Sequence, residues 1–176
     1  DDVLREVSKV FVVACGTAFH SGLVAKYAIE HWTRLPVEIE IASEFRYRDP
    51  VMGPDTLTLA VSQSGETIDT LEAARHARRQ GSQVIAVTNT VGSSLAREAD
   101  GVLYTHAGPE IGVASTKTFA TQMVAQQLVA LYLAQVRGTK FPEEIADVLA
   151  ELAALPGQVE RAIQLDAHVR AIAERF

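Results

Sequence analysis

The chain has 176 residues, 48% of them hydrophobic and 22% charged, with a formal net charge of −6 at pH 7. This composition is typical of a globular domain with a real core, and the acidic balance argues against a broad nucleic-acid surface. The single cysteine excludes an internal disulfide and a cysteine-based zinc site. Neither a signal peptide nor an apolar span of roughly 18 residues is present. We therefore expect a cytoplasmic protein, or part of one, with no membrane or nucleic-acid partner.

Short apolar runs alternate along the chain with stretches of helical periodicity. The run at 9–14 is continuously apolar, as in a central parallel strand, whereas 37–41 alternates strictly, as in a strand nearer the edge. The other predicted strands are 56–61, 83–88 and 101–104. The predicted helices are 19–34, 68–80, 93–99, a long one that follows residue 115 and ends near 137, 142–154 and 158–176, with 42–48 as a short helix or an ordered loop.

This order of elements predicts an α/β fold with right-handed βαβ crossovers. We expect a doubly wound, five-stranded parallel sheet with helices on both faces and extra C-terminal helices. Residues 1–176 are expected to form a single domain of a longer polypeptide, because the first residue is not Met and the last residues still follow a helical pattern.

One turn carries most of the chemical information. Ser62-Gln63-Ser64-Gly65-Glu66-Thr67 joins a predicted buried strand to a predicted helix. The first N–H groups of such a helix lack partners and carry the positive end of the helix dipole, so they favour an anion such as phosphate. The hydroxyl and amide side chains add donors, and Gly65 permits close approach of the backbone. No group in this set is positively charged, which predicts reversible binding of a phosphoester and not phosphoryl transfer.

The same turn has a plainer interpretation. Serine and threonine before a helix are common N-caps without any ligand. Two acids near the helix start, Glu66 and Asp69, oppose a bound phosphate unless they point away from it.

Two other turns of small residues are predicted at the same edge of the sheet. These are Cys15–Ala18 and Gly112–Ser115. Ligands of doubly wound sheets bind beyond the carboxyl ends of the strands, near the point where the strand order reverses. The three turns are therefore expected to form one shared pocket.

Four stretches resemble the sugar-isomerase (SIS) domain family. They are Cys15-Gly16-Thr17, residues 40–48, residues 62–67 and residues 110–117. The resemblance implies a flavodoxin-like fold. The second stretch (Glu-Ile-Ala-Ser-Glu-Phe-Arg-Tyr-Arg) and the fourth (Glu-Ile-Gly-Val-Ala-Ser-Thr-Lys) are the more specific ones. They resemble the first SIS module of isomerising glutamine–fructose-6-phosphate aminotransferases, the glucosamine-6-phosphate synthases.

The resemblance implies roles for individual residues. Ser62, Gln63, Ser64 and Thr67 would bind the phosphate, Thr17 would contact the sugar chain, Val113 would offer a backbone group and Ser115 would line the pocket. The residues themselves add Cys15, Gly16, Gly65, Glu110 and Lys117 as candidates for the pocket wall, with Glu110 as an acceptor or base and Lys117 as a positive charge near the phosphate. Ala18 departs from the family pattern, in which a serine often reaches a sugar hydroxyl.

The resemblance also implies a division of labour. This chain would bind fructose 6-phosphate or glucosamine 6-phosphate in hexosamine biosynthesis, with no cofactor and no metal. The catalytic groups would lie in a second SIS module, and a glutaminase domain of the parent chain would supply ammonia, so the fragment alone would be inactive. The family's modules dimerise, and the apolar helix at 118–136 suits a homodimer. The alternative function is a non-catalytic sugar-phosphate sensor in a regulator.

Several residues have ordinary explanations as well. Cys15 follows a buried strand, where cysteine is usually a small packed residue, and nothing in the sequence places a base beside it. Lys117 suits an exposed helix surface, and Glu110 suits an exposed loop. The five histidines show no metal-binding spacing.

Overall fold

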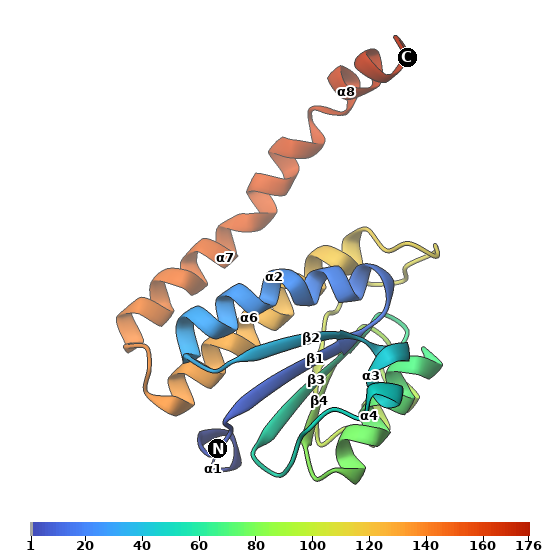
Figure 1. Cartoon of the computed structure of the whole chain (residues 1–176). Coiled ribbons are helices and arrows are strands. Elements are labelled where there is room, and N and C mark those ends of the chain that lie inside the picture. The colour runs from blue at the N-terminus through green and yellow to red at the C-terminus, as the bar shows by residue number, and fades with distance from the viewer. Residues whose placement is uncertain (1) are drawn as a thin grey trace. The chain divides into compact units, whose positions relative to one another are not determined.

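The computed structural model describes residues 2–176 (Figure 1). The chain forms two compact units, the first ending at Lys140 and the second comprising Phe141–Phe176. The first unit contains, in order, α1 (Asp2–Arg5), β1 (Lys9–Ala14), α2 (Gly16–Thr33), β2 (Val37–Ile41), α3 (Ala42–Arg48), β3 (Thr56–Ser62), α4 (Ile68–Arg79), β4 (Gln83–Thr88), α5 (Ser94–Glu98), β5 (Gly101–Tyr104) and α6 (Lys117–Arg137). The second contains α7 (Pro142–Ile163) and α8 (Asp166–Ala173).

The five strands form one parallel sheet in the order β2-β1-β3-β4-β5. This confirms the predicted α/β class and the number and direction of the strands. The continuously apolar β1 is central and β2 is an edge strand, as their sequence patterns predicted. The strand order reverses between β1 and β3, which makes the carboxyl ends of these two strands the expected place for a ligand.

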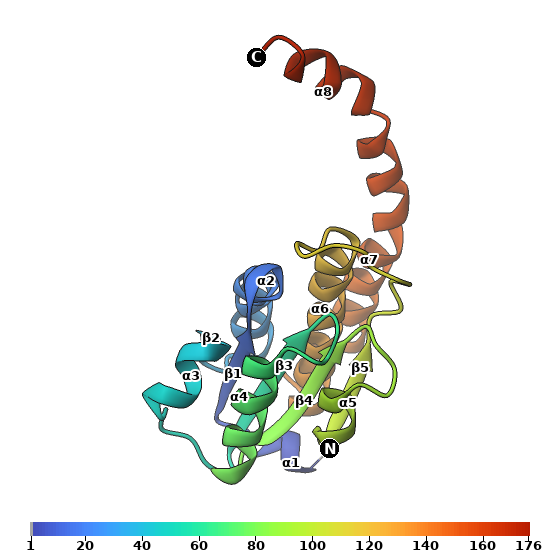
Figure 2. The same cartoon turned by 90° about the vertical axis from the view of Figure 1, so that its right-hand side faces the viewer.

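Helices cover both faces of the sheet (Figures 1 and 2). Side chains alternate along a strand, so Val10 and Val12 of β1 pack toward α2 and α6, whereas Phe11 and Val13 pack toward α3, α4 and α5. Phe45 of α3 is fully buried, and its ring meets that of Phe11 edge to face at 5.5 Å. Each face of the sheet therefore has its own apolar core.

Two predicted helix boundaries are wrong. Helix α2 begins at Gly16, not at Phe19, because Gly16 has a φ of +59° and turns the chain from strand to helix at a single residue. Thr17 therefore lies in the first turn of α2. In the second unit, α7 continues through Pro156, where a break was expected, and the break lies instead at 164–165, within the predicted helix 158–176. Pro156 is exposed, so water can hydrate the carbonyl group that the proline leaves without a donor.

Helix α6 contains the apolar stretch at 118–136 that suited a homodimer. It buries a broad face that includes Gln122, Gln126 and Leu133, but Leu128 and Tyr132 remain 37% and 48% exposed. Among the helices that the structure describes, none is long and apolar enough to cross a membrane.

Candidate functional site

A cavity of about 280 Å³ lies at the carboxyl ends of β1 and β3, and all three predicted turns contribute to its wall. Of the candidate residues, the lining includes Cys15, Gly16, Thr17, Ser62, Gln63, Ser64, Thr67, Val113 and Ser115. Ala18, Val61 and Thr70 also line it, although the sequence did not single them out as ligand-binding residues. Gly65, Glu110 and Lys117 are not part of this wall.

A larger hollow of about 490 Å³ opens beside the other end of α2 and is lined by residues that include His31, Arg34 and Pro36. The carbonyl groups of a helix C-terminus point toward that end, and they carry the negative end of the dipole. The smaller cavity is therefore the better candidate for an anionic ligand, despite its size.

Two helix N-termini face the smaller cavity without a side-chain cap. Cys15 precedes α2 and Thr67 precedes α4, and neither side chain accepts a hydrogen bond from the helix that follows it. The first N–H groups of both helices are therefore left for other acceptors, and both dipoles favour negative charge at this place.

Hydrogen bonds within the 62–67 turn orient its hydroxyl groups. The Oγ of Ser62 accepts from the backbone N–H of Gly65 at 3.1 Å and lies 3.1 Å from Oγ1 of Thr67. The Oγ of Ser64 accepts from the backbone N–H of Glu66 at 3.1 Å. Because the Ser64 oxygen is already an acceptor, its own proton remains available for a ligand oxygen. The turn thus presents donors, which suits a phosphate.

Gly65 is required by the packing of the turn. Its φ is +65°, and a Cβ at this position would lie 2.1 Å from the Oγ of Ser93. The carbonyl of Gly65 accepts from the backbone N–H of Leu95 at 3.0 Å. The close approach expected here is therefore an approach to the loop between β4 and α5, and Gly65 does not line the cavity.

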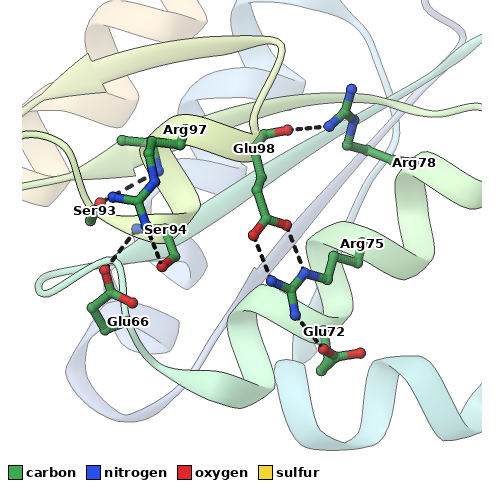
Figure 3. A network of polar contacts seen from close by, with 9 residues as sticks. Glu66, Glu72, Arg75, Arg78, Ser93, Ser94, Arg97 and Glu98 are labelled. Atoms are coloured by element: carbon green, nitrogen blue, oxygen red, sulfur yellow. Dashed lines mark hydrogen bonds and ion pairs between the residues drawn. The ribbon is translucent and has the colours of Figure 1, made fainter.

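Glu66 points away from the cavity and caps another helix. Its carboxylate accepts from the backbone N–H of Ser94, at the start of α5, at 2.7 Å (Figure 3). This backbone hydrogen bond, together with the Ser94 hydroxyl, lowers the pKa of Glu66. Of the two acids that opposed a phosphate site on sequence grounds, Glu66 thus serves the α5 dipole instead. The other, Asp69, is not among the residues that line the cavity.

An ion pair holds α5 against α4. The guanidinium of Arg75 donates to both carboxylate oxygens of Glu98, at 2.6 and 2.5 Å, and to Glu72 at 2.7 Å (Figure 3). The hydrogen bond from Arg75 is the main cause of the lowered pKa of Glu98. A bidentate ion pair of this kind fixes the orientation of α5 on α4. It therefore also holds the loop between β4 and α5, against which Gly65 packs.

Glu110 holds the start of α6. Its carboxylate accepts from the hydroxyl of Thr118 at 2.7 Å and from the Thr118 backbone N–H at 2.9 Å. These two bonds, the hydroxyl first, lower the pKa of Glu110, which makes it a weak base. Glu110 lines a neighbouring hollow of about 530 Å³ that shares Gln63 with the cavity, and Lys117 is exposed at the first position of α6.

No group of three or more His, Cys, Asp or Glu side chains that could hold a metal occurs in the described part of the chain. Cys15 is a free, half-buried thiol in the cavity wall. The site therefore offers uncharged donors and two helix dipoles, an arrangement able to bind an anion reversibly.

Residues 3–132 match the SIS domain family. The chain belongs to this family. Over 97% of its length this SIS domain is 65% identical to the isomerizing glutamine–fructose-6-phosphate aminotransferase of Streptomyces coelicolor, and over its whole length it is 64% identical to that of Mycolicibacterium smegmatis. It spans about 28% of the length of each of these relatives.

Solved structures agree with this assignment. The C-terminal domain of glucosamine-fructose-6-phosphate aminotransferase from Francisella tularensis superimposes with a TM-score of 0.94 at 40% identity, covering 98% of this SIS domain and 49% of that chain. A phosphosugar isomerase homologue from Clostridium difficile, which superimposes with a TM-score of 0.85 at 19% identity over 93% of this SIS domain and 47% of that chain, shares the fold.

The packing of Gly65 gives a stability prediction with a matched control. Gly92 also has a positive φ, +73°, but a Cβ there would meet nothing within 4 Å. Gly92→Ala should cost only the backbone strain, about 1–2 kcal/mol. Gly65→Ala adds the clash with Ser93 and should cost about 1–3 kcal/mol more in the free energy of unfolding measured with urea. Equal losses would contradict the close packing of Gly65.

The Glu110 cap gives a pH-dependent prediction. The folded-state pKa of Glu110 lies below its usual 4.5, so the ionised carboxylate stabilises the fold above about pH 4.5 and loses this effect as the pH falls through the lowered value. Glu110→Gln should therefore lower the melting temperature more at pH 7 than at pH 3. Glu44→Gln, at an exposed acid of α3, controls for the loss of one negative charge. A deficit that is the same at both pH values would rule out the charged cap.

Proposed function

We propose that this SIS domain is the hexose 6-phosphate-binding half of an isomerising glutamine–fructose-6-phosphate aminotransferase, and that the cavity at the ends of β1 and β3 binds the phosphate. The observation that carries the proposal is the meeting of two uncapped helix N-termini with the hydroxyls of one turn. The relatives described above carry this enzyme's name, which favours this function over a regulatory sensor.

The 62–67 turn holds the phosphate in this proposal. Ser62, Ser64 and Thr67 donate from hydroxyl groups and Gln63 donates from its amide, with the N–H groups of α4 behind them. The sugar extends toward the other two segments, where the wall consists of Cys15, Gly16, Thr17, Val113 and Ser115. Ala18 supplies no hydroxyl, so the contact to a sugar hydroxyl on that side is either absent or made through water.

The domain binds and orients substrate and leaves the chemistry to another module. The cavity wall contains no histidine, lysine, aspartate or glutamate, so none of the usual acid–base groups of this kind reaches the sugar from within the described residues. In the overall reaction, ammonia released from glutamine adds to C2 of fructose 6-phosphate with loss of water. A proton then moves from C1 to C2 and gives glucosamine 6-phosphate. A second SIS module and a glutaminase domain of the same parent chain supply these steps.

A homodimer is the expected assembly. Leu128 and Tyr132 of α6 border an apolar groove of about 390 Å³ beside β5, and such surfaces mark protein interfaces. Sedimentation of the chain over a range of concentrations should detect the dimer, and Leu128→Glu should weaken it. A monomer at every concentration contradicts the dimer.

We expect the parent enzyme in the cytoplasm without membrane or nucleic-acid partners, and its recovery in a membrane pellet would contradict this.

Calorimetric titration of the chain with fructose 6-phosphate, glucosamine 6-phosphate and unphosphorylated fructose tests the binding proposal. Both hexose phosphates should bind and fructose should not. Ser64→Ala with Thr67→Ala should weaken binding at least about tenfold. Each protein hydroxyl that no longer donates to the charged phosphate costs about 1.5–3 kcal/mol of binding free energy. Ser43→Ala with Thr121→Ala removes the same kinds of hydroxyl outside the cavity and should have no effect. A folded chain that binds none of these ligands refutes the proposal.

A further inference from the structure

Thr70 is the third residue of α4, lines the cavity and is 1% exposed. Its Oγ1 is buried and has no hydrogen-bond partner. A buried hydroxyl without a partner destabilises a protein, and such groups are rare in native structures. The position of Thr70 in a ligand cavity suggests that the missing partner comes from outside the chain.

Other buried helical hydroxyls of this chain show what Thr70 lacks. Ser21 donates to the carbonyl of Ala18 at 2.7 Å, and Thr33 donates to that of Ile29 at 2.6 Å. This bond to the carbonyl three or four residues earlier is the usual solution for serine and threonine in helices. At Thr70 the corresponding bond is not made. The carbonyl three residues earlier, that of Thr67, accepts from the backbone N–H of Leu71 at 3.0 Å, and the Thr70 hydroxyl does not use the second lone pair of that carbonyl.

The surroundings of Thr70 lack a capping group as well. Thr67, the N-cap residue of α4, lies 3.1 Å from Ser62 through its hydroxyl and does not cap the helix. The N–H groups of the first turn of α4 and the Thr70 hydroxyl are therefore unpaired on the same turn. Two independent observations, an uncapped helix N-terminus and a buried unpaired hydroxyl, thus point to an anion at one place.

We propose that Thr70 binds the phosphate group of the ligand, donating from Oγ1 to a phosphate oxygen. This inference rests on the proposed phosphate site and adds a residue to it. Threonine in helices occupies two χ1 rotamers, so a single turn about χ1 exchanges its methyl and hydroxyl positions without movement of the backbone. Thr70 sacrifices stability in the ligand-free chain and gains a charge-assisted hydrogen bond when phosphate binds.

The test compares Thr70→Val, which replaces the hydroxyl with a methyl of similar size, with Thr70→Ser, which keeps the hydroxyl. Thr70→Val should raise the melting temperature of the ligand-free chain by about 2–4 °C, because the unpaired polar group is gone. The same variant should bind fructose 6-phosphate and inorganic phosphate about tenfold or more weakly than the parent chain does. Thr70→Ser should bind both ligands nearly as the parent chain does.

Opposite effects on stability and binding separate a ligand contact from a purely structural role. If Thr70→Val melts at a lower temperature and binds phosphate normally, the hydroxyl is structural and the inference fails. If Thr70→Val weakens the binding of fructose 6-phosphate but not that of inorganic phosphate, Thr70 contacts the sugar and the phosphate assignment is wrong. If Ser64→Ala with Thr67→Ala abolishes binding and Thr70→Val does not, only the role of Thr70 is refuted. If the parent chain binds no phosphate ligand, the proposed site itself fails.

Discussion

The parallel pairing of β1 with β3 is the constraint on which the site depends. Ala14 and Val61 are register partners, so both strands end at the same edge of the sheet. The chain then leaves β1 into α2 on one face and leaves β3 into α4 on the other (Figure 2). Two helix N-termini are brought together in this way at the reversal of strand order, and their dipoles act on one small cavity.

Two acidic residues near the cavity accept hydrogen bonds from the starts of neighbouring helices. Glu66 caps α5 and Glu110 caps α6, and in both cases the hydrogen bonds lower the pKa of the carboxyl group. The carboxylates thus remain ionised, stiffen the loops that border the site and direct their charge to helix starts outside the proposed anion site. The Arg75–Glu98 pair joins α4 to α5 and so stabilises the loop before α5, which packs against the 62–67 turn.

Uncharged donors determine what kind of chemistry suits this site. Hydroxyl, amide and backbone N–H groups would hold the phosphoester of the proposed ligand without neutralising it fully, which favours release of that ligand. The buried hydroxyl of Thr70 has no partner in the ligand-free chain, where it lowers the stability of the fold. In the proposed complex it would donate to the phosphate. Binding and stability are therefore expected to trade against one another at this edge of the sheet.

Local sequence patterns determined the five strands, the edge position of β2 and the three turns that meet at the cavity, because the periods of strands and helices are written in neighbouring residues. Only the tertiary structure decided that Gly65 packs on Ser93, that Glu66 caps α5 and that Thr70 lacks a partner. In each case the decisive group is either brought from a distant segment or missing, and no local pattern records which partners packing will supply.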